Sequence, residues 1–167
     1  MSLSNPGPTV PIKCQYRYSL VRYIGGGRVG NLCWVMLNPS TADDTKDDPT
    51  IRRVKRFTYD AGYTSVVVVN LFAMRATRPV HLYEAAEAGY DPVGHANADT
   101  IHSACATSSA VVFAWGAWPG VAKLTHPNVD FIARSYGHAP LCLGVTKSGA
   151  PRHPLYVKAD QPLVAFA

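Results

Sequence analysis

Four short apolar runs lie along the chain, and segments with helical patterning separate them. The runs occupy residues 32–37, 65–70, 110–115 and 140–145. Apolar runs of this length are typical of strands buried on both faces of a parallel sheet. Parallel strands need crossover connections, which helices usually supply. The sequence therefore predicts an α/β fold, a three-layer α/β/α sandwich with a mostly parallel central sheet.

Helical signals fill the spaces between these runs. Asp48 and Pro49 form an N-cap followed by proline at the first helical position, and Gly62 marks the end of the helix that they begin. Further elements are predicted downstream: helices over residues 81–88, 94–108 and 121–136, the last interrupted near Pro127, and a small strand over residues 155–157.

An alternating, aromatic-rich segment precedes the first apolar run. Residues 16–23 have the period of a half-buried strand, and a glycine-rich segment joins them to the run at 32–37. The glycines match the pattern G-x-G-x-x-G, but a dinucleotide site needs a helix after them, and here a strand follows. We therefore interpret residues 25–30 as the loop of an N-terminal antiparallel hairpin.

Length and composition predict one globular domain. The chain has 167 residues, of which 47% are hydrophobic and 16% charged, a balance that can bury a sizeable core. We expect a flexible, proline-rich arm over residues 1–14 and a single α/β domain over residues 15–167. The net charge of +5 permits contact with nucleic acid without requiring it, because the basic residues are not gathered in one run.

Two features bear on the compartment. No apolar run approaches the roughly 18 residues that span a bilayer, and residues 1–11 do not resemble a signal peptide. None of the four cysteines falls in a Cys-x-x-Cys pair, and Cys33 and Cys142 lie in apolar runs as small core residues. We therefore expect a cytoplasmic protein without membrane contact.

Polar residues follow the ends of the apolar runs. Asn38 and Ser40 come after the first run, Asn70 ends the second and Trp115 ends the third. In an open parallel sheet the carboxyl ends of the strands form one rim, where ligands bind. Asparagine supplies both a donor and an acceptor, and serine adds a hydroxyl. The rim is therefore a candidate binding site, although asparagine, proline and serine are also ordinary turn residues.

The segment after the fourth run adds Arg152, His153 and Tyr156. We expect Asn38, Asn70 and His153 to converge at the rim. Two amides and an imidazole suit recognition of a polar planar ring such as a nucleobase. The alternative is structural, since a lone histidine is more often bonded to backbone and an asparagine can fix a turn.

An acidic cluster lies between the first run and the first predicted helix. Asp43, Asp44, Asp47 and Asp48 carry the oxygen ligands that hard cations prefer. Their spacing differs from that of an EF-hand loop. Helix capping explains Asp48, and solvated loop charges explain the others, so metal binding is the weaker interpretation. We expect no cofactor. The sequence contains no G-x-S-x-G elbow, so no serine hydrolase is indicated.

Four segments together carry a family resemblance. In chain order they are LNPSTADDTKDDPTIRR, VVNLFAMRATRP, WGAW and SGAPRHPLYV. With these motifs the chain, from about Tyr16 to its C-terminus, resembles an uncharacterised bacterial and phage family, domain of unknown function 1643. This resemblance covers nearly the whole chain but implies no settled activity.

A more distant resemblance is to the uracil-DNA glycosylase superfamily. The segment ending at Asn70 is similar to its strand with a base-reading asparagine, and Trp115 resembles the tryptophan of its Leu-Trp-Gly strand. His153 resembles the histidine of its His-Pro-Ser motif. Asn38 is similar to the asparagine that positions the attacking water in a Gly-x-Asn-Pro motif. These motifs keep the superfamily's order, which implies its fold.

The chain also departs from that superfamily's pattern. Met36 and Leu37 replace the glycine that opens the first motif, and Leu155 with Tyr156 replaces the serine and proline of the DNA-pinching loop. No aspartate stands where many members keep a water-activating carboxylate. The fold inference survives these changes, but they put the glycosylase activity in doubt, because fold does not fix function.

The superfamily resemblance implies roles at the rim. By it, Asn38 holds a water, Asn70 reads the base edge and His153 donates to the charge developing on the departing base. Ligand contacts are expected from Ser40, Trp115 and Tyr156, and phosphate contacts from Arg52, Arg75 and Arg152.

The leading functional hypothesis is that the protein binds a nucleobase or nucleic acid at the carboxyl rim. The same hypothesis extends to cleavage of an N-glycosidic bond. The first alternative is a non-catalytic nucleic-acid or nucleotide binding module. The second is a metal-dependent hydrolase that uses the aspartate cluster between residues 43 and 48.

Overall fold

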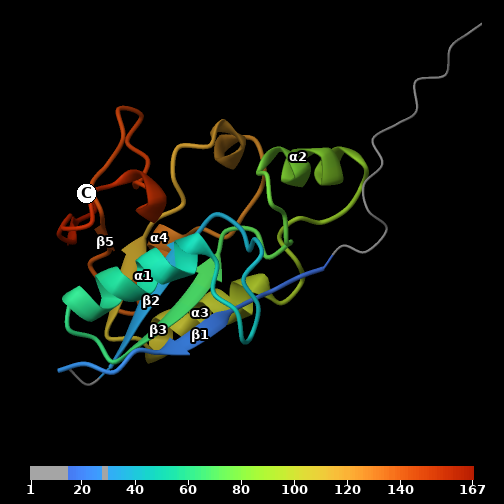
Figure 1. Cartoon of the computed structure of the whole chain (residues 1–167). Coiled ribbons are helices and arrows are strands. Elements are labelled where there is room, and N and C mark those ends of the chain that lie inside the picture. The colour runs from blue at the N-terminus through green and yellow to red at the C-terminus, as the bar shows by residue number, and fades with distance from the viewer. Residues whose placement is uncertain (1–14, 28–29) are drawn as a thin grey trace, which may run out of the picture.

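The computed structural model describes residues 15–27 and 30–167 (Figure 1), so the expected arm over residues 1–14 lies outside the described residues. The strands are β1 (Leu20–Tyr23), β2 (Asn31–Met36), β3 (Ser65–Asn70), β4 (Ala110–Phe113), β5 (Leu141–Cys142) and β6 (Val164–Ala165). They form one six-stranded sheet in the order β1-β3-β2-β4-β5-β6. The four inner strands run parallel, and β1 and β6 pair antiparallel at the two edges.

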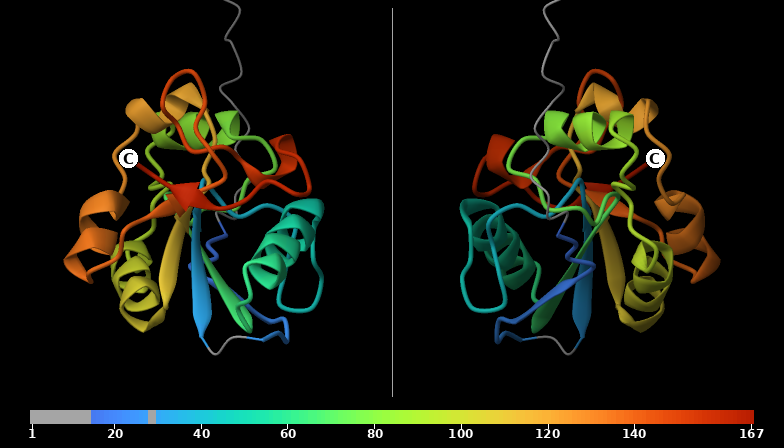
Figure 2. Two further views of the ribbon diagram at one scale, coloured as in Figure 1. Left: turned by 90° about the vertical axis from the view of Figure 1, so that its left-hand side faces the viewer. Right: turned by 90° about the vertical axis from the view of Figure 1, so that its right-hand side faces the viewer.

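Helices lie on both faces of this sheet (Figure 2). α1 (Pro49–Asp60) covers one face, and α3 (Asn97–Thr107) and α4 (Val129–Ser135) cover the other. Three further helical elements gather at the end where the parallel strands finish: α2 (Val80–Glu87) and the 3-10 helices η1 (Pro119–Ala122) and η2 (Pro154–Tyr156). The predicted α/β fold with a mostly parallel sheet is confirmed. Among the described residues, no helix is both long and apolar enough to cross a membrane.

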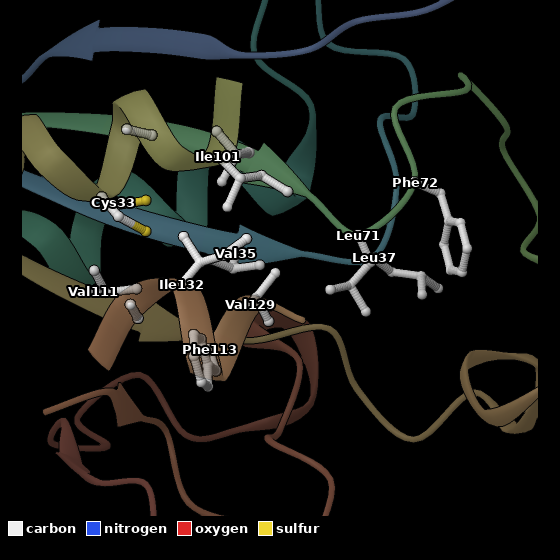
Figure 3. Packing of buried hydrophobic residues seen from close by; sticks show 14 of the residues in the cluster. Cys33, Val35, Leu37, Leu71, Phe72, Ile101, Val111, Phe113, Val129 and Ile132 are labelled. Carbon is white, nitrogen blue, oxygen red and sulfur yellow. The ribbon is translucent and has the colours of Figure 1, made fainter. Parts of the chain in front are cut away.

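Alternate side chains of β2 belong to two separate apolar cores. Cys33 and Val35 pack toward α3 and α4 (Figure 3), whereas Trp34 and Met36 pack toward α1. The run lacks polar alternation because both faces of the strand are covered, as predicted. Cys33 and Cys142 are both fully buried, which confirms them as core residues.

The start of α1 follows the predicted capping pattern. Asp48 Oδ1 accepts a hydrogen bond from the backbone N–H of Ile51 over 2.8 Å, and Pro49 is the first helical residue. Gly62, with a φ of 82°, follows the helix where the chain turns toward β3. The cap therefore anchors the helix at the end of the loop that leaves β2.

The predicted N-terminal hairpin is wrong. β1 pairs with β3 rather than with β2, and Leu20 stands opposite Val68. β2 is buried on both faces and takes a parallel neighbour on each side, whereas β1 buries only Leu20, which suits an edge strand. The glycine-rich segment is thus no hairpin loop. The N–H groups of Ile24 and Gly25 both donate to the carbonyl of Thr64, just before β3.

Three other elements also differ from prediction. The small strand expected after His153 is replaced by η2, because Pro154 starts a 3-10 turn that the histidine ring caps. The helix expected over residues 121–136 restarts after Pro127, as predicted, with Asn128 as the cap, but only α4 is α-helical. The fourth apolar run contributes only the two residues of β5.

Candidate functional site

A cavity of about 650 Å³ opens at the carboxyl ends of the parallel strands. β3 and β4 lie on opposite sides of β2, so the order in which strands are added to the sheet reverses at β2. Open α/β sheets bind ligands at the rim beside such a reversal. Side chains from the loops after β2 and β4, from the end of β3, from the first turn of α1 and from η2 line the cavity. We call it the rim cavity.

The structure brings seven of the nine predicted site residues to this cavity. Those seven are Asn38, Ser40, Asn70, Trp115, Arg152, His153 and Tyr156. Arg52 and Arg75 do not line it. Arg52 is exposed on α1 and donates to the carbonyl of Asp47 over 2.9 Å, while Arg75 donates to the carbonyl of Ala42 over 3.0 Å. Of the three arginines predicted to meet phosphate, only Arg152 faces the cavity.

Asn38 has a fixed amide orientation. Its Nδ2 donates to the carbonyls of Pro39 and Ala76 over 2.9 and 2.7 Å. Both N–H groups are therefore used, which leaves Oδ1 as the free end of the amide. No donor within the described part of the chain reaches this oxygen. Asn38 can thus accept a hydrogen bond from a molecule in the cavity.

Asn70 is the last residue of β3, and 2% of its surface is exposed. Its Nδ2 is buried and has no hydrogen-bond partner among the described residues. Asn97 holds the backbone there, because its Nδ2 donates to the carbonyls of Asn70 and Leu71 over 2.9 and 3.1 Å. A buried donor without a partner costs about 1–3 kcal/mol, and a ligand acceptor would recover that free energy.

His153 caps η2 through its ring. Nδ1 accepts a hydrogen bond from the backbone N–H of Leu155 over 3.2 Å, which assigns the proton of the neutral ring to Nε2. Burial lowers the pKa of His153, and the nearby charge of Asp48 only partly opposes this effect. At neutral pH the ring is therefore a neutral donor through Nε2–H, which meets no acceptor in residues 15–27 and 30–167.

The segment before η2 is tied to the loop after β4. The N–H of Gly116 donates to the carbonyl of Pro151 over 2.9 Å, and Gly116 has a φ of 78°. A Cβ at this position would lie 3.3 Å from the Cβ of His153. Both the backbone conformation and the close approach favour glycine, and together they keep the histidine against the cavity.

Arg53 holds η2 from the side of α1. Its Nε and Nη2 donate to the carbonyls of Pro154 and Val157 over 3.2 and 2.6 Å, so the guanidinium joins both ends of η2 to the helix. Sequence reasoning missed this residue. No local signal could have revealed it, because its partner at Pro154 lies 101 residues further along the chain.

Two more charged residues that line the cavity were missed. Asp48 is buried there, and its Oδ1 and Oδ2 accept from the N–H groups of Ile51 and Ala42 over 2.8 and 3.3 Å. A helix that follows a parallel strand starts at the carboxyl rim, so its N-cap could have been recognised as a rim residue. Arg17 gave no such signal, since its place depends on β1 lying beside β3.

Three of the four clustered aspartates, Asp43, Asp47 and Asp48, already have hydrogen-bond or ion-pair partners. Hydrogen bonds from the backbone of Thr45 and Lys46 lower the pKa of Asp43. Partial burial works to raise the pKa of Asp47, but hydrogen bonds from Lys55 and Arg22, both at 2.8 Å, outweigh it. Within the described residues, no group of three or more His, Cys, Asp or Glu side chains is arranged to hold a metal ion.

Comparison with known proteins places the chain in a family. Residues 17–155 match the family described as a protein of unknown function, DUF1643. The chain belongs to this family. The DUF1643 match includes every residue that lines the rim cavity except Tyr156. No curated protein and no solved structure matches the chain, so the likeness to uracil-DNA glycosylases remains a prediction from the motifs.

Proposed function

We propose that the chain binds a nucleobase-containing ligand in the rim cavity and hydrolyses its N-glycosidic bond. One observation carries the proposal. Asn38, Asn70 and His153 line the same cavity, and each has a polar side-chain atom without a partner among the described residues. These atoms are one acceptor and two donors, Oδ1, Nδ2 and Nε2. The edge of a nucleobase presents complementary groups.

Each atom suits one part of the reaction. Asn70 Nδ2 donates to an acceptor on the base, and Asn38 Oδ1 accepts from a water and directs it at the sugar carbon C1′. When the bond between C1′ and the base nitrogen breaks, its electron pair moves to the base, and His153 Nε2–H donates to the developing charge. The water oxygen bonds to C1′, and one water proton ends on the base.

Aromatic side chains add a stacking surface. Trp115 and Tyr156 line the cavity, and the ring centroids of Tyr156 and His153 lie 5.5 Å apart. Tyr156 is 80% exposed, so it stands at the mouth. Stacking of a base on an aromatic ring contributes about 1–3 kcal/mol and is tolerant of sequence. The volume of about 650 Å³ is also in the range of small-ligand sites.

The ordered motifs support the same proposal. Asn38, Asn70, Trp115 and His153 occur in the order of the resembling motifs of the uracil-DNA glycosylase superfamily, and we propose that this chain shares that superfamily's fold. The departures at residues 36–37 and 155–156 line the cavity, so the choice of base and of DNA, RNA or free nucleotide need not follow the superfamily.

One observation favours a second candidate, a non-catalytic nucleic-acid or nucleotide binding module. Asp48 is the carboxylate that lines the cavity, and backbone N–H groups already bind both of its oxygens. Those hydrogen bonds engage the oxygens that would have to accept a proton from the attacking water. The cavity would then bind a base without cleaving its bond.

Base release separates the two candidates. The substrates are DNA and RNA oligomers carrying uracil, mismatches or damaged bases, together with free nucleosides. The expected result is release by the native chain and a much larger loss of rate than of binding in Asn38→Ala, because a group that holds the water acts mainly at the transition state. Binding without release from any of these substrates would leave the binding module as the function.

A further inference from the structure

One wall of the rim cavity carries a half-buried arginine with no acidic partner among the described residues. Arg17 lines the cavity, and its Nε is buried without a hydrogen-bond partner in the described part of the chain. Its Nη1 donates to the carbonyl of Ala42. Among the described residues no carboxylate lies within 4.0 Å of the guanidinium. A buried donor of a charged group without a partner is costly, so the Nε–H of Arg17 favours an acceptor from a ligand.

A second arginine stands beside it. Residues 15–17 run antiparallel to residues 73–75, so Arg17 and Arg75 project from the same side of this short ladder. Both donate to the same acceptor, the carbonyl of Ala42. Burial, followed by the charge of Arg75, lowers the pKa of Arg17, while Asp48 and Asp44 act in the opposite direction. Two like charges held together in this way are destabilising until an anion joins them.

We propose that Arg17, supported by Arg75, is an anion subsite of the rim cavity and binds a phosphate group of the ligand. The inference rests on the proposed function, because it takes the ligand to be a nucleotide unit. A guanidinium offers its donors in a planar fork that fits two phosphate oxygens, and Arg17 has the Nε corner of that fork unused. Asn70 would then read the base while Arg17 binds the phosphate, so the cavity selects nucleotides over nucleosides.

Asp48 is the acidic group that shares this cavity with Arg17. Its two oxygens face the N–H groups of Ile51 and Ala42, at the N-terminus of α1 and in the preceding loop. Asp48 therefore alters the electrostatic potential in the cavity but forms no ion pair with the guanidinium of Arg17. The positive end of the helix dipole also offsets part of its charge, which keeps the subsite suitable for an anion.

Matched ligands test the proposal on the native chain. The probes are the four common ribonucleosides, their 5′- and 3′-monophosphates, inorganic phosphate and a short single-stranded oligonucleotide, titrated at one ionic strength by calorimetry. A monophosphate is expected to bind at least tenfold more tightly than its nucleoside, the scale of a hydrogen bond to a charged group. Tighter binding of the monophosphate than of the strand indicates a free nucleotide, and the reverse order indicates a polymer.

Variants then assign the subsite. Arg17→Gln should abolish the advantage of the monophosphate, and Arg17→Lys, which keeps the charge but loses the fork, should lose most of it. Arg134→Gln is the matched control, since it removes the same charge from α4 on the other face of the sheet, where Arg134 pairs only with Asp130. It should retain the full advantage.

The outcomes keep the two proposals apart. Nucleosides that bind as tightly as monophosphates, or a phosphate advantage that persists in both Arg17 variants, would overturn the anion subsite and leave the proposed function standing. Binding of inorganic phosphate through Arg17, with no binding of any nucleoside or nucleotide, would overturn the proposed function and keep the subsite. No binding of any probe would overturn both.

Discussion

On the α3 and α4 face of the sheet, β2 and β3 lead to buried leucines, whereas on the α1 face they lead to asparagines. Leu37 and Leu71 belong to the core under α3 and α4. Asn38 and Asn70 are their neighbours in sequence and project toward the other face, where they line the rim cavity. One face therefore continues its packing to the rim, and the other ends in polar atoms.

Two buried asparagines show the same contrast in one residue type. Asn97, on α3, donates from Nδ2 to two backbone carbonyls and does not line the cavity, although its Oδ1 has no partner among the described residues. Asn70, on the α1 face, lines the cavity, and its Nδ2 donates a hydrogen bond to no described group. The α3 asparagine stabilises the fold, while the rim asparagine is available to a ligand. We infer that the two faces divide stability and binding between them.

Truncation on the packed face should have the largest effect on stability. Phe113 is fully buried at the end of β4 in the core under α3 and α4. Phe113→Ala should lower the free energy of unfolding by about 3–5 kcal/mol, through lost burial and the cavity left behind. Urea titration measures it. Phe131→Ala, on α4 but 67% exposed, is the control and should change stability by about 0.5 kcal/mol or less. Equal losses in both variants would contradict the assignment of the core.

Truncation on the rim should affect the reaction instead. His153→Ala should lower the rate of base release on the order of 100-fold, because it removes a donor to the developing charge. His81→Ala removes an exposed imidazole from α2, outside the cavity, and should leave the rate unchanged. Single-turnover rates on the best substrate of the native chain measure both. If the two variants lose rate equally, His153 is not the donor.

The two asparagines give the sharpest contrast. Asn97→Ala leaves two buried carbonyls without their donor and should lower the free energy of unfolding by about 1–3 kcal/mol. Asn70→Ala removes an unpaired amide, so stability should stay level or rise while ligand affinity falls. Urea titration and calorimetry on both variants measure these changes. A large loss of stability in Asn70→Ala would show that its amide has a structural partner instead of a ligand.

Local patterns predicted the sheet and its rim better than they predicted the contacts that support the rim. The four apolar runs indicated the parallel sheet, because burial on both faces leaves no alternation. Polar residues at and beyond the ends of those runs indicated the rim, and Asn38, Asn70 and His153 line one cavity there. The place of Arg17 could not be predicted, since it requires β1 to pair with β3 instead of forming a hairpin. Arg53 likewise depends on a contact between α1 and the distant η2.

Loss of Arg53 should have an intermediate effect on the reaction. Arg53→Ala releases the carbonyls of Pro154 and Val157, so His153 is less well positioned, and the rate of base release should fall roughly tenfold. Arg56→Ala is the control, because Arg56 lies on the same helix and pairs only with Asp60 on the surface. Since Arg53 acts through His153, the double variant Arg53→Ala with His153→Ala should be no slower than His153→Ala alone. A further tenfold loss in the double variant would mean that Arg53 acts independently.

The smallest expected effect is a dependence of stability on pH that arises at His153. Burial lowers the pKa of this ring in the folded chain below its usual value of about 6.5. Below that value the unfolded chain binds a proton that the folded chain resists, so unfolding becomes easier as pH falls, until the pH also drops below the folded pKa. The free energy of unfolding, measured by urea titration near pH ~8 and pH ~5, should therefore decrease more in the native chain than in His153→Gln, which cannot titrate. His81→Gln, an exposed ring, should behave like the native chain. An equal decrease in the native chain and in His153→Gln would show that the ring is charged as easily in the cavity as in water, and the effect of burial on the pKa of His153 would then be contradicted.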